Sequence, residues 1–418
     1  MKRNQLPSSN SIKRLRNHLG IYAVAVITLA QLFGTSLWFS ANSAVLDLMR
    51  EWQASPADIG WLTSAVQLGF IIGTLVISVS GLADRFRASV IFTVSALVGA
   101  GFNAGFAWLA ADLTEGIIYR FLVGITLAGV YPIGMKLMVQ WAPERAGWAL
   151  SLLVAMLTLG TALPYGLREL VAELPWREII TISSLLAVIS ALLIALLGDK
   201  PRVAQQPHLP TDATDHSRFS TYRLFNIHNF RAAATGYFGH MWELYAFWTI
   251  VPLYVSSLKL HESLGHVGVA GLTFFIMAMG AVGCVVGGKL SQRFGSAKVA
   301  ASALTLSGLC GVVFLFGWRF LPAWVLLVVL LLWGATVIAD SPHFSALSAK
   351  ACPPRFVGSA LALQNSIGFV ITIISITITT YLFEEIGLDS AIVLLLGPVL
   401  GITGFRKFNR HIIKRQSY

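Results

Sequence analysis

Twelve long runs of mostly apolar residues restrict the fold of this chain more than any other feature of its sequence. A helix needs about 20 such residues to cross the hydrocarbon core of a membrane. The runs cover approximately residues 19–46, 57–80, 88–110, 113–138, 146–168, 177–198, 229–257, 265–287, 297–317, 321–345, 356–382 and 388–405. They are too long for strands, and lipid favours helices because a helix satisfies its own backbone hydrogen bonds. We therefore predict an all-α membrane protein with twelve transmembrane helices.

Composition and cysteine content agree with this class and exclude others. Charged residues make up 12% of the 418 residues, whereas a soluble domain carries about 25%. The three cysteines, Cys284, Cys310 and Cys352, show neither paired nor metal-binding spacing, so we expect no disulfide framework, metal or cofactor. The first apolar run is longer than the core of a signal peptide, which indicates an uncleaved first span.

The formal net charge of +11 is distributed unevenly between the two sides of the predicted bundle. With the N-terminus in the cytoplasm, 23 of the 30 Lys and Arg residues fall in cytoplasmic segments and two fall within spans. The five on the opposite side are Arg50, Arg168, Arg177, Lys259 and Arg319, and 12 of the 19 acidic residues accompany them. This is the positive-inside pattern of a bacterial inner-membrane protein with both termini in the cytoplasm. We expect contact with the lipid bilayer and none with nucleic acid.

The chain divides into two repeats. A polar stretch over 199–228 separates a predicted N-terminal six-helix bundle (1–198) from a C-terminal one (229–418). Four residues of the first half, Gly124, Pro132, Pro143 and Arg145, recur 210 positions later as Gly334, Pro342, Pro353 and Arg355. Transporters built from such repeats place their site near the membrane midplane, where the halves meet. We predict two six-helix repeat bundles around a central cavity.

At these residues the chain resembles the major facilitator superfamily. That family carries G-x-L-x-D-R-x-G after its second helix, and residues 80–87 keep Leu82, Asp84 and Arg85 while replacing both glycines. The equivalent segment of the second half keeps both glycines and Arg293 but has Gln292 in place of the acid. The helix 4 signature, an Arg followed four residues later by Gly, stands as Arg120 and Gly124.

The resemblance implies a monomeric transporter whose helices 1, 4, 7 and 10 line the cavity. It also implies a cytoplasmic gate in which Asp84 acts as a latch between the halves. The gating candidates are Asp84, Arg85, Arg293, Asp340 and Arg355.

Ionisable residues inside a span are costly and mark candidate functional sites. Arg120 and Glu243 come from different halves and are predicted at similar depth, and a guanidinium suits a carboxylate or phosphate of a solute. A permanent Arg120–Glu243 pair is the alternative. His240 and Glu243 are three residues apart and are predicted to exchange a proton, with a static hydrogen bond as the alternative. Asp340 is predicted near the cytoplasmic face, where Pro342 breaks the helix, as a gate, a helix end or a solvated end.

Uncharged side chains complete the predicted binding site. Gln31, Thr35, Trp38 and Asn42 are spaced four, three and four apart and form one polar stripe on helix 1. The stripe faces either the cavity or a neighbouring helix through packing hydrogen bonds. The further substrate-binding candidates are Tyr131, Tyr237, Gln364 and Asn365.

These features predict a secondary active transporter that moves a small organic solute, with an anion or zwitterion favoured, by proton-coupled alternating access. Proton-driven efflux of amphipathic drugs or metabolites is the alternative. A transporter-like sensor would need an output domain, and an intramembrane enzyme would need a nucleophile with its base or a metal cluster. The sequence shows no output domain, no nucleophile–base set and no metal cluster. It also lacks a phosphate-binding loop for ATP.

Overall fold

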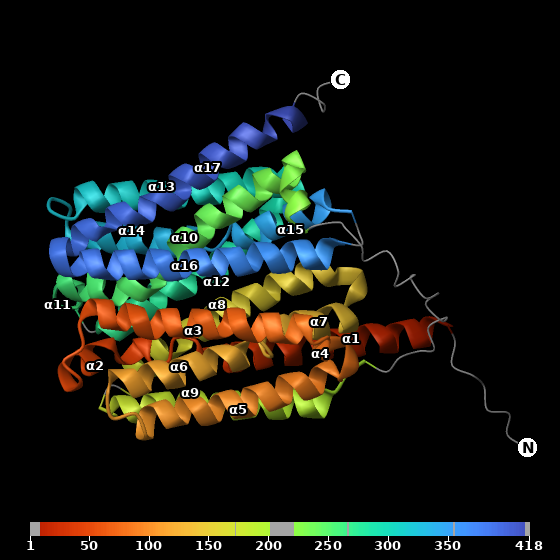
Figure 1. Cartoon of the computed structure of the whole chain (residues 1–418), viewed down its shortest axis with the longest axis horizontal. Helices are drawn as coiled ribbons and strands as arrows, with labels where there is room; N and C mark the ends of the chain where they lie inside the picture. Colours follow the sequence, from red (N-terminus) through yellow and green to blue (C-terminus); the bar gives the residue numbers. More distant parts are fainter. Residues whose placement is uncertain (1–8, 172, 201–220, 266, 354–355, 414–418) are drawn as a thin grey trace, which may run out of the picture.

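The computed structural model describes residues 9–171, 173–200, 221–265, 267–353 and 356–413, and this part of the chain is built from helices alone. Figure 1 shows long helices running side by side along one axis. The elements of the first half are α1 (Ser9–Gly34), η1 (Thr35–Leu37), η2 (Asn42–Ala44), α2 (Val45–Glu51), α3 (Pro56–Val79), α4 (Leu82–Arg85), α5 (Ala88–Trp108), α6 (Leu113–Leu127), α7 (Tyr131–Trp141), η3 (Pro143–Arg145), α8 (Ala146–Leu170) and α9 (Trp176–Leu197).

The second half follows the same plan. Its elements are η5 (Thr221–Asn226), α10 (His228–Ser257), α11 (Leu260–Leu264), α12 (Val269–Phe294), α13 (Ser296–Gly317), α14 (Ala323–Thr336), α15 (Ser341–Ala351), α16 (Val357–Ile386), η7 (Gly387–Ser390) and α17 (Ala391–Ile413). Most of the linker predicted over 199–228 lies outside the described residues.

All twelve predicted runs fall on helical segments of the structure, which confirms the fold class. Ten segments of the described chain are long and apolar enough to cross a membrane. One of them, 360–407, covers most of both α16 and α17. Helix α10 is not among the ten, and its apolar residues are interrupted by polar ones, including His240 and Glu243.

Two predicted helices are each broken in the middle, at equivalent positions of the two halves. The span over 113–138 is divided into α6 and α7, and the span over 321–345 into α14 and α15. In both cases a proline, Pro132 or Pro342, occupies the first turn of the second piece. Proline is tolerated there because that position of a helix needs no backbone N–H donor.

Close helix packing repeats in the two halves as well. A Cβ atom on Gly124 of α6 would overlap the backbone carbonyl of Val66 in α3. A Cβ atom on Gly334 of α14 would overlap the carbonyl of Ile276 in α12. Both contacts are offset by 210 residues, so the internal repeat of the sequence is a repeat of packing.

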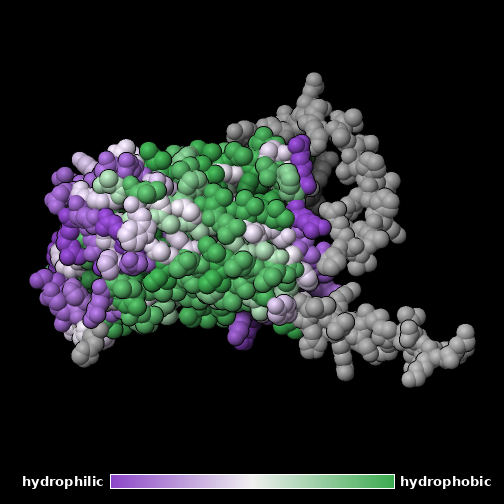
Figure 2. Space-filling view, turned by 90° about the horizontal axis from the view of Figure 1, so that it is seen from below, coloured by the Kyte–Doolittle hydropathy of each residue, from purple (hydrophilic) through white to green (hydrophobic). Residues whose placement is uncertain are grey.

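The two halves meet along two seams, one between α8 and α12 and the other between α3 and α16. We call the end of the bundle at which α3, α6, α12 and α14 begin the outer end, and the opposite end the inner end. The face in Figure 2 has a broad apolar band between two polar ends, as a membrane-spanning protein requires.

Candidate functional site

Arg120 of α6 is completely buried within the first half, where it binds backbone rather than an acid. Its Nη1 donates to the carbonyl of Leu37 at 3.0 Å, to Ser40 Oγ at 3.2 Å and to Asn103 Oδ1 at 3.1 Å. Its Nη2 donates to the carbonyl of Trp38. The guanidinium therefore holds the irregular segment that follows α1.

That segment removes the continuous helix on which the predicted polar stripe depended. Helix α1 ends at Gly34, and the chain continues through η1 and η2. Thr35 Oγ1 donates to the carbonyls of Gln31 at 2.7 Å and Leu157 at 3.5 Å, and Asn42 Nδ2 donates to Thr63 Oγ1 at 2.7 Å. The prediction of one continuous helical stripe is wrong. The contacts of Thr35 with α8 and of Asn42 with α3 are packing hydrogen bonds, the alternative that the sequence left open.

Trp38 faces the second half, where it joins a cluster of four rings. Its ring centroid lies 5.0 Å from that of Phe70, 5.8 Å from Tyr245 and 6.1 Å from Phe369. The centroids of Phe70 and Phe369 are 4.6 Å apart. We call Trp38, Phe70, Tyr245 and Phe369 the aromatic cluster. It joins helices of both halves and is buried, with no ring residue more than 5% exposed.

His240 of α10 and Asp340 form a buried acid–base pair in the second half. The Nδ1 atom of His240 lies 2.8 Å from Asp340 Oδ1 and 2.9 Å from the carbonyl oxygen of Val337. Both side chains are fully buried, and His240 Nε2 has no hydrogen-bond partner among the described residues.

The predicted position of Asp340 near the cytoplasmic face is wrong. Asp340 precedes α15 directly, and α15 continues for 11 residues to Ala351. At 1.5 Å per residue, Asp340 is about 16 Å from the inner end of this helix. The carboxylate thus belongs to the interior of the span, at the break between α14 and α15.

Glu243 of α10 makes its hydrogen bonds with other groups than this pair. Its Oε1 accepts hydrogen bonds from Ser307 Oγ at 2.8 Å and Trp333 Nε1 at 2.7 Å. Its Oε2 has no partner within the described part of the chain. The alternative of a permanent Arg120–Glu243 pair fails, because the two charges bind separate sets of groups in separate halves.

The remaining predicted residues are dispersed. The Tyr237 ring lies 5.8 Å from the His240 ring, and Gln364 Oε1 accepts a hydrogen bond from Ser348 at 2.5 Å. Tyr131, the first residue of α7, and Asn365 of α16 are half-buried. Of the gating candidates, Arg85 and Arg293 are exposed at the inner ends of α4 and α12. The Asp84 side chain and Arg355 lie outside the described residues.

Two carboxylates at the outer end were missed by sequence analysis. Glu169 of α8 accepts hydrogen bonds from the backbone N–H groups of Gly268 at 2.8 Å and Gly271 at 3.0 Å, at the start of α12. Glu384 of α16 accepts one from the N–H of Ala57 at 2.7 Å, in the first turn of α3. We call these contacts the inter-half caps. Their position at equivalent ends of the repeats, 215 residues apart, was the signal that could have identified them.

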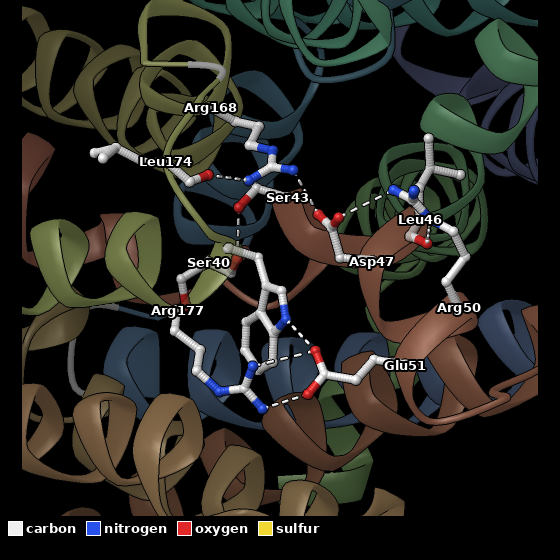
Figure 3. Close-up of polar contacts among 10 residues, drawn as sticks. Ser40, Ser43, Leu46, Asp47, Arg50, Glu51, Arg168, Leu174 and Arg177 are labelled. Atoms are coloured by element: carbon white, nitrogen blue, oxygen red, sulfur yellow. Dashed lines mark hydrogen bonds and ion pairs between the residues drawn. The ribbon is translucent and has the colours of Figure 1, made fainter.

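Ion pairs also cover the outer end (Figure 3). Asp47 lies between Arg50 at 3.1 Å and Arg168 at 2.8 Å, and Glu51 pairs with Arg177 at 2.5 Å. The hydrogen bond from Arg177 lowers the pKa of the Glu51 carboxyl, so Glu51 is charged at neutral pH. Two further pairs join Lys259 to Glu262 at 3.9 Å and Arg319 to Asp389 at 2.5 Å. Each of the five basic residues predicted on the outer side therefore has an acidic partner.

Comparison with known protein families identifies the family to which this two-half helical bundle belongs. Residues 26–376 match the family model of the Major Facilitator Superfamily. The chain belongs to this superfamily. It is thus a multi-pass membrane protein, and its family and curated relatives are transporters rather than enzymes.

Among curated proteins, the Niacin transporter NiaP of Acinetobacter baylyi is 30% identical over 128 residues, which are 28% of either chain. The 4-hydroxybenzoate transporter PcaK of the same species is 34% identical over 98 residues, or 23% of this chain and 21% of that protein. These matches thus span only about a quarter of the relatives. A longer match, 24% identical over 77% of this chain and 78% of that protein, is the Probable sulfoacetate transporter SauU of Cupriavidus necator.

Solved structures share the fold at low sequence identity. A D-xylose-proton symporter has a TM-score of 0.76 at 17% identity, covering 93% of this chain and 98% of that chain. A bacterial homologue of the human lysosomal transporter Spinster, in an inward-facing and unoccupied conformation, has a TM-score of 0.71 at 14% identity, covering 95% and 98%.

Proposed function

We propose that this transporter moves a small organic anion or zwitterion together with protons, by alternating access in the inner membrane of a bacterium. Residues 1–198 and 229–418 act as the two moving bodies, and both termini face the cytoplasm. The curated relatives support an acidic solute, because niacin, 4-hydroxybenzoate and sulfoacetate all carry acid groups. Proton coupling rests on this chain's own buried ionisable residues.

The His240–Asp340 pair is the observation that carries the proposal. A buried carboxylate is costly unless a partner compensates its charge, and His240 lies against Asp340 with Nδ1 2.8 Å from Oδ1. The two residues lie on different elements, α10 and the break between α14 and α15. A shift of either element changes the distance between Nδ1 and Oδ1, so the contact between the two side chains depends on the conformation.

The same pair links the proton to an anion. When the imidazole binds a proton, both of its nitrogens become donors. Nδ1 already faces Asp340 and Val337, whereas Nε2 is buried without an acceptor among the described residues. A solute carboxylate supplies that acceptor. Proton binding and anion binding then strengthen each other by linkage, which is the thermodynamic requirement for their joint movement.

Glu243 is the second proposed proton-binding group. Its carboxyl is fully buried, and one oxygen accepts two hydrogen bonds while the other accepts none within the described chain. A proton on the free oxygen neutralises the group without breaking either bond. Tyr131, Tyr237, Gln364 and Asn365 are proposed as polar contacts to the solute. The proposed gating residues are Asp84, Arg85, Arg293 and Arg355.

Proteoliposomes with an imposed pH gradient test the coupling. We expect Asp340→Asn and Glu243→Gln each to abolish the accumulation of labelled nicotinate or benzoate against its gradient. Counterflow exchange, which needs no net proton movement, should partly survive. The matched control is Glu262→Gln, which removes an exposed acid at the outer end. Wild-type accumulation by both interior variants would refute proton coupling at these carboxyls.

The alternative, efflux of amphipathic cations, is tested in the same vesicles. Proton-driven extrusion of an amphipathic cation, without movement of any carboxylate, would replace the proposed function with this alternative. Movement of carboxylates alone would exclude it.

A further inference from the structure

We infer that the aromatic cluster selects solutes that contain a planar aromatic ring, so that the anions carried are aromatic carboxylates. This inference rests on the proposed function and specifies its substrate class. The residues concerned are Trp38 and Phe70 of the first half and Tyr245 and Phe369 of the second.

The geometry of Trp38 is the first observation. Its indole is nearly parallel to Tyr245, with an interplanar angle of 23°, and to Phe369, with an angle of 21°. Both of these rings belong to the opposite half of the molecule. Ring centroids between 4.5 and 7 Å apart in offset arrangements are the favourable contacts of aromatic pairs. Trp38 therefore stacks across the junction of the two halves.

Alternating access requires these stacked rings to separate. The inter-half caps of Glu169 and Glu384 hold the outer end closed in this conformation. When the halves part there, Trp38 moves away from Tyr245 and Phe369, and flat apolar faces are exposed on both sides. A planar aromatic solute can enter between them and restore two stacked contacts. A saturated ring of similar size presents no flat face and no ring quadrupole, so it restores less of the lost interaction.

The indole N–H groups of the junction are the second observation. Trp38 Nε1 is buried and has no hydrogen-bond partner within the described residues, and the same is true of Trp248 Nε1. The Trp248 ring packs edge-on against Tyr245, 5.5 Å away. By contrast, Trp242 Nε1 donates to the Val393 carbonyl at 2.7 Å. A buried donor normally has an acceptor. The carboxylate of a bound solute would provide one directly beside the stacking site.

Arg120 gives this arrangement its rigidity. It binds the carbonyls of Leu37 and Trp38, so the backbone that carries the indole is fixed to α6. Arg120 is thereby a positioning residue, and Trp38 is the residue that contacts the solute. A rigid support makes the distance between opposing rings reproducible in each transport cycle, as selection by ring thickness requires.

The experiment compares matched pairs of ligands on the purified full-length protein. Benzoate and cyclohexanecarboxylate have the same charge and ring size but differ in planarity, and benzamide with cyclohexanecarboxamide forms the neutral pair. Binding is measured as the ligand-induced rise in Tm in detergent, and transport as counterflow in proteoliposomes. We expect benzoate to bind about tenfold more tightly than cyclohexanecarboxylate.

Variants locate the effect. In Trp38→Leu, the ratio between the planar and saturated acids should fall close to one. In Trp38→Phe, which keeps a ring but loses the N–H group, ring preference should persist, and the preference for benzoate over benzamide should decline. Trp324→Leu is the matched control, because Trp324 is 62% exposed on the surface of α14. Unchanged ratios in both Trp38 variants would overturn the inference even if wild-type selectivity were present.

The two proposals can fail separately. Equal binding and proton-driven transport of both acids would overturn ring selection and leave the proposed function standing. Selection of benzamide over its saturated analogue, with no binding of either acid, would support ring selection and refute an anionic solute. Binding of neither pair would overturn the inference.

Discussion

At the scale of single residues, Arg120 shows how a charge can be stable inside a membrane protein without an acidic partner. Four acceptors surround it, two of them backbone carbonyls. A hydrogen bond to a charged group contributes about 1.5–3 kcal/mol, so several such bonds offset much of the desolvation cost. The planar fork of the guanidinium is what allows one side chain to reach acceptors in several directions.

Arg120→Lys should therefore reduce both stability and transport, although it preserves the charge. A lysine ammonium is a compact charge that cannot span acceptors on Leu37, Trp38, Ser40 and Asn103 at once. We expect a Tm several degrees lower in detergent and a loss of most counterflow activity. Arg177→Lys, in an exposed pair with Glu51, is the control and should change Tm little. A wild-type Tm for Arg120→Lys would show that the fork is not required.

Sequence analysis identified the interior charges but not their partners. Arg120, His240 and Glu243 stand out because ionisable residues are rare in spans. Two of the four acceptors of Arg120 are peptide carbonyls, which every residue has and which therefore leave no sequence signal. The partner of His240 lies 100 positions away and reaches it only because the helix breaks before Pro342, a geometry that hydropathy does not encode.

At the scale of helices, each inter-half cap joins the two halves across one of the seams at the outer end. A carboxylate at a helix N-terminus interacts with free N–H groups and with the helix dipole, for about 0.3–1 kcal/mol. Glu169 belongs to α8 and caps α12, whereas Glu384 belongs to α16 and caps α3. Each cap must break when the halves separate there, so together they favour the conformation that is closed at the outer end.

Glu169→Gln and Glu384→Gln should each shift the protein toward an outer-open state, by up to about fivefold in the population ratio. The population can be measured by maleimide labelling of Ser43→Cys in a background without the native cysteines. Ser43 is 8% exposed and lies beside Pro252 and Val269 at the outer seam. The double variant should label fastest, and Glu262→Gln should label like its parent. Equal labelling of all four would exclude a gating role for the caps.

Close helix packing gives a second prediction at this scale. Gly124→Ala and Gly334→Ala place a methyl group against the backbone of α3 and α12, respectively, so each should lower Tm by several degrees. Gly101→Ala in α5 is the matched control, because a Cβ atom there would have no heavy atom within 4 Å. Its Tm should be unchanged or slightly higher, since alanine favours helix. Comparable losses at all three positions would contradict close packing as the cause.

The helices themselves were predictable because membrane spans are specified by length and hydropathy, which the sequence shows directly. The repeat was also visible, in residues such as Gly124 and Gly334 that packing requires in both halves. The break at 128–130 was not predicted, since hydropathy continues across it. Pro342 indicated a helix break near Asp340, whereas Pro132 was recognised only as a repeated residue, and its meaning as the start of a new helix came with the structure.

At the scale of the whole molecule, charge is segregated by end as well as by depth. Each basic residue of the outer end is paired with an acid, and Arg50 and Arg168 share Asp47, while most basic residues are predicted toward the other end. Because the few basic residues of the outer end are paired with acids, the excess of Lys and Arg at the inner end sets the predicted orientation in the membrane. This arrangement supports the proposed orientation, which reporter fusions to both termini would test directly.

The pairing at the outer end also determines how a solute meets the molecule in solution. The five basic residues there are outnumbered by twelve acidic ones, so the rim carries an excess of negative charge after every pair is formed. An anion that approaches from this side is repelled before it reaches the midplane, and one that leaves is pushed away. The Debye length is about 10 Å at 0.1 M salt and about 30 Å at 0.01 M, so the repulsion is strongest in dilute buffer. Initial uptake of an anion through this end should thus rise as ionic strength increases at constant osmolarity, whereas uptake of a neutral analogue should not. A rate that falls with added salt would show that the rim attracts the solute.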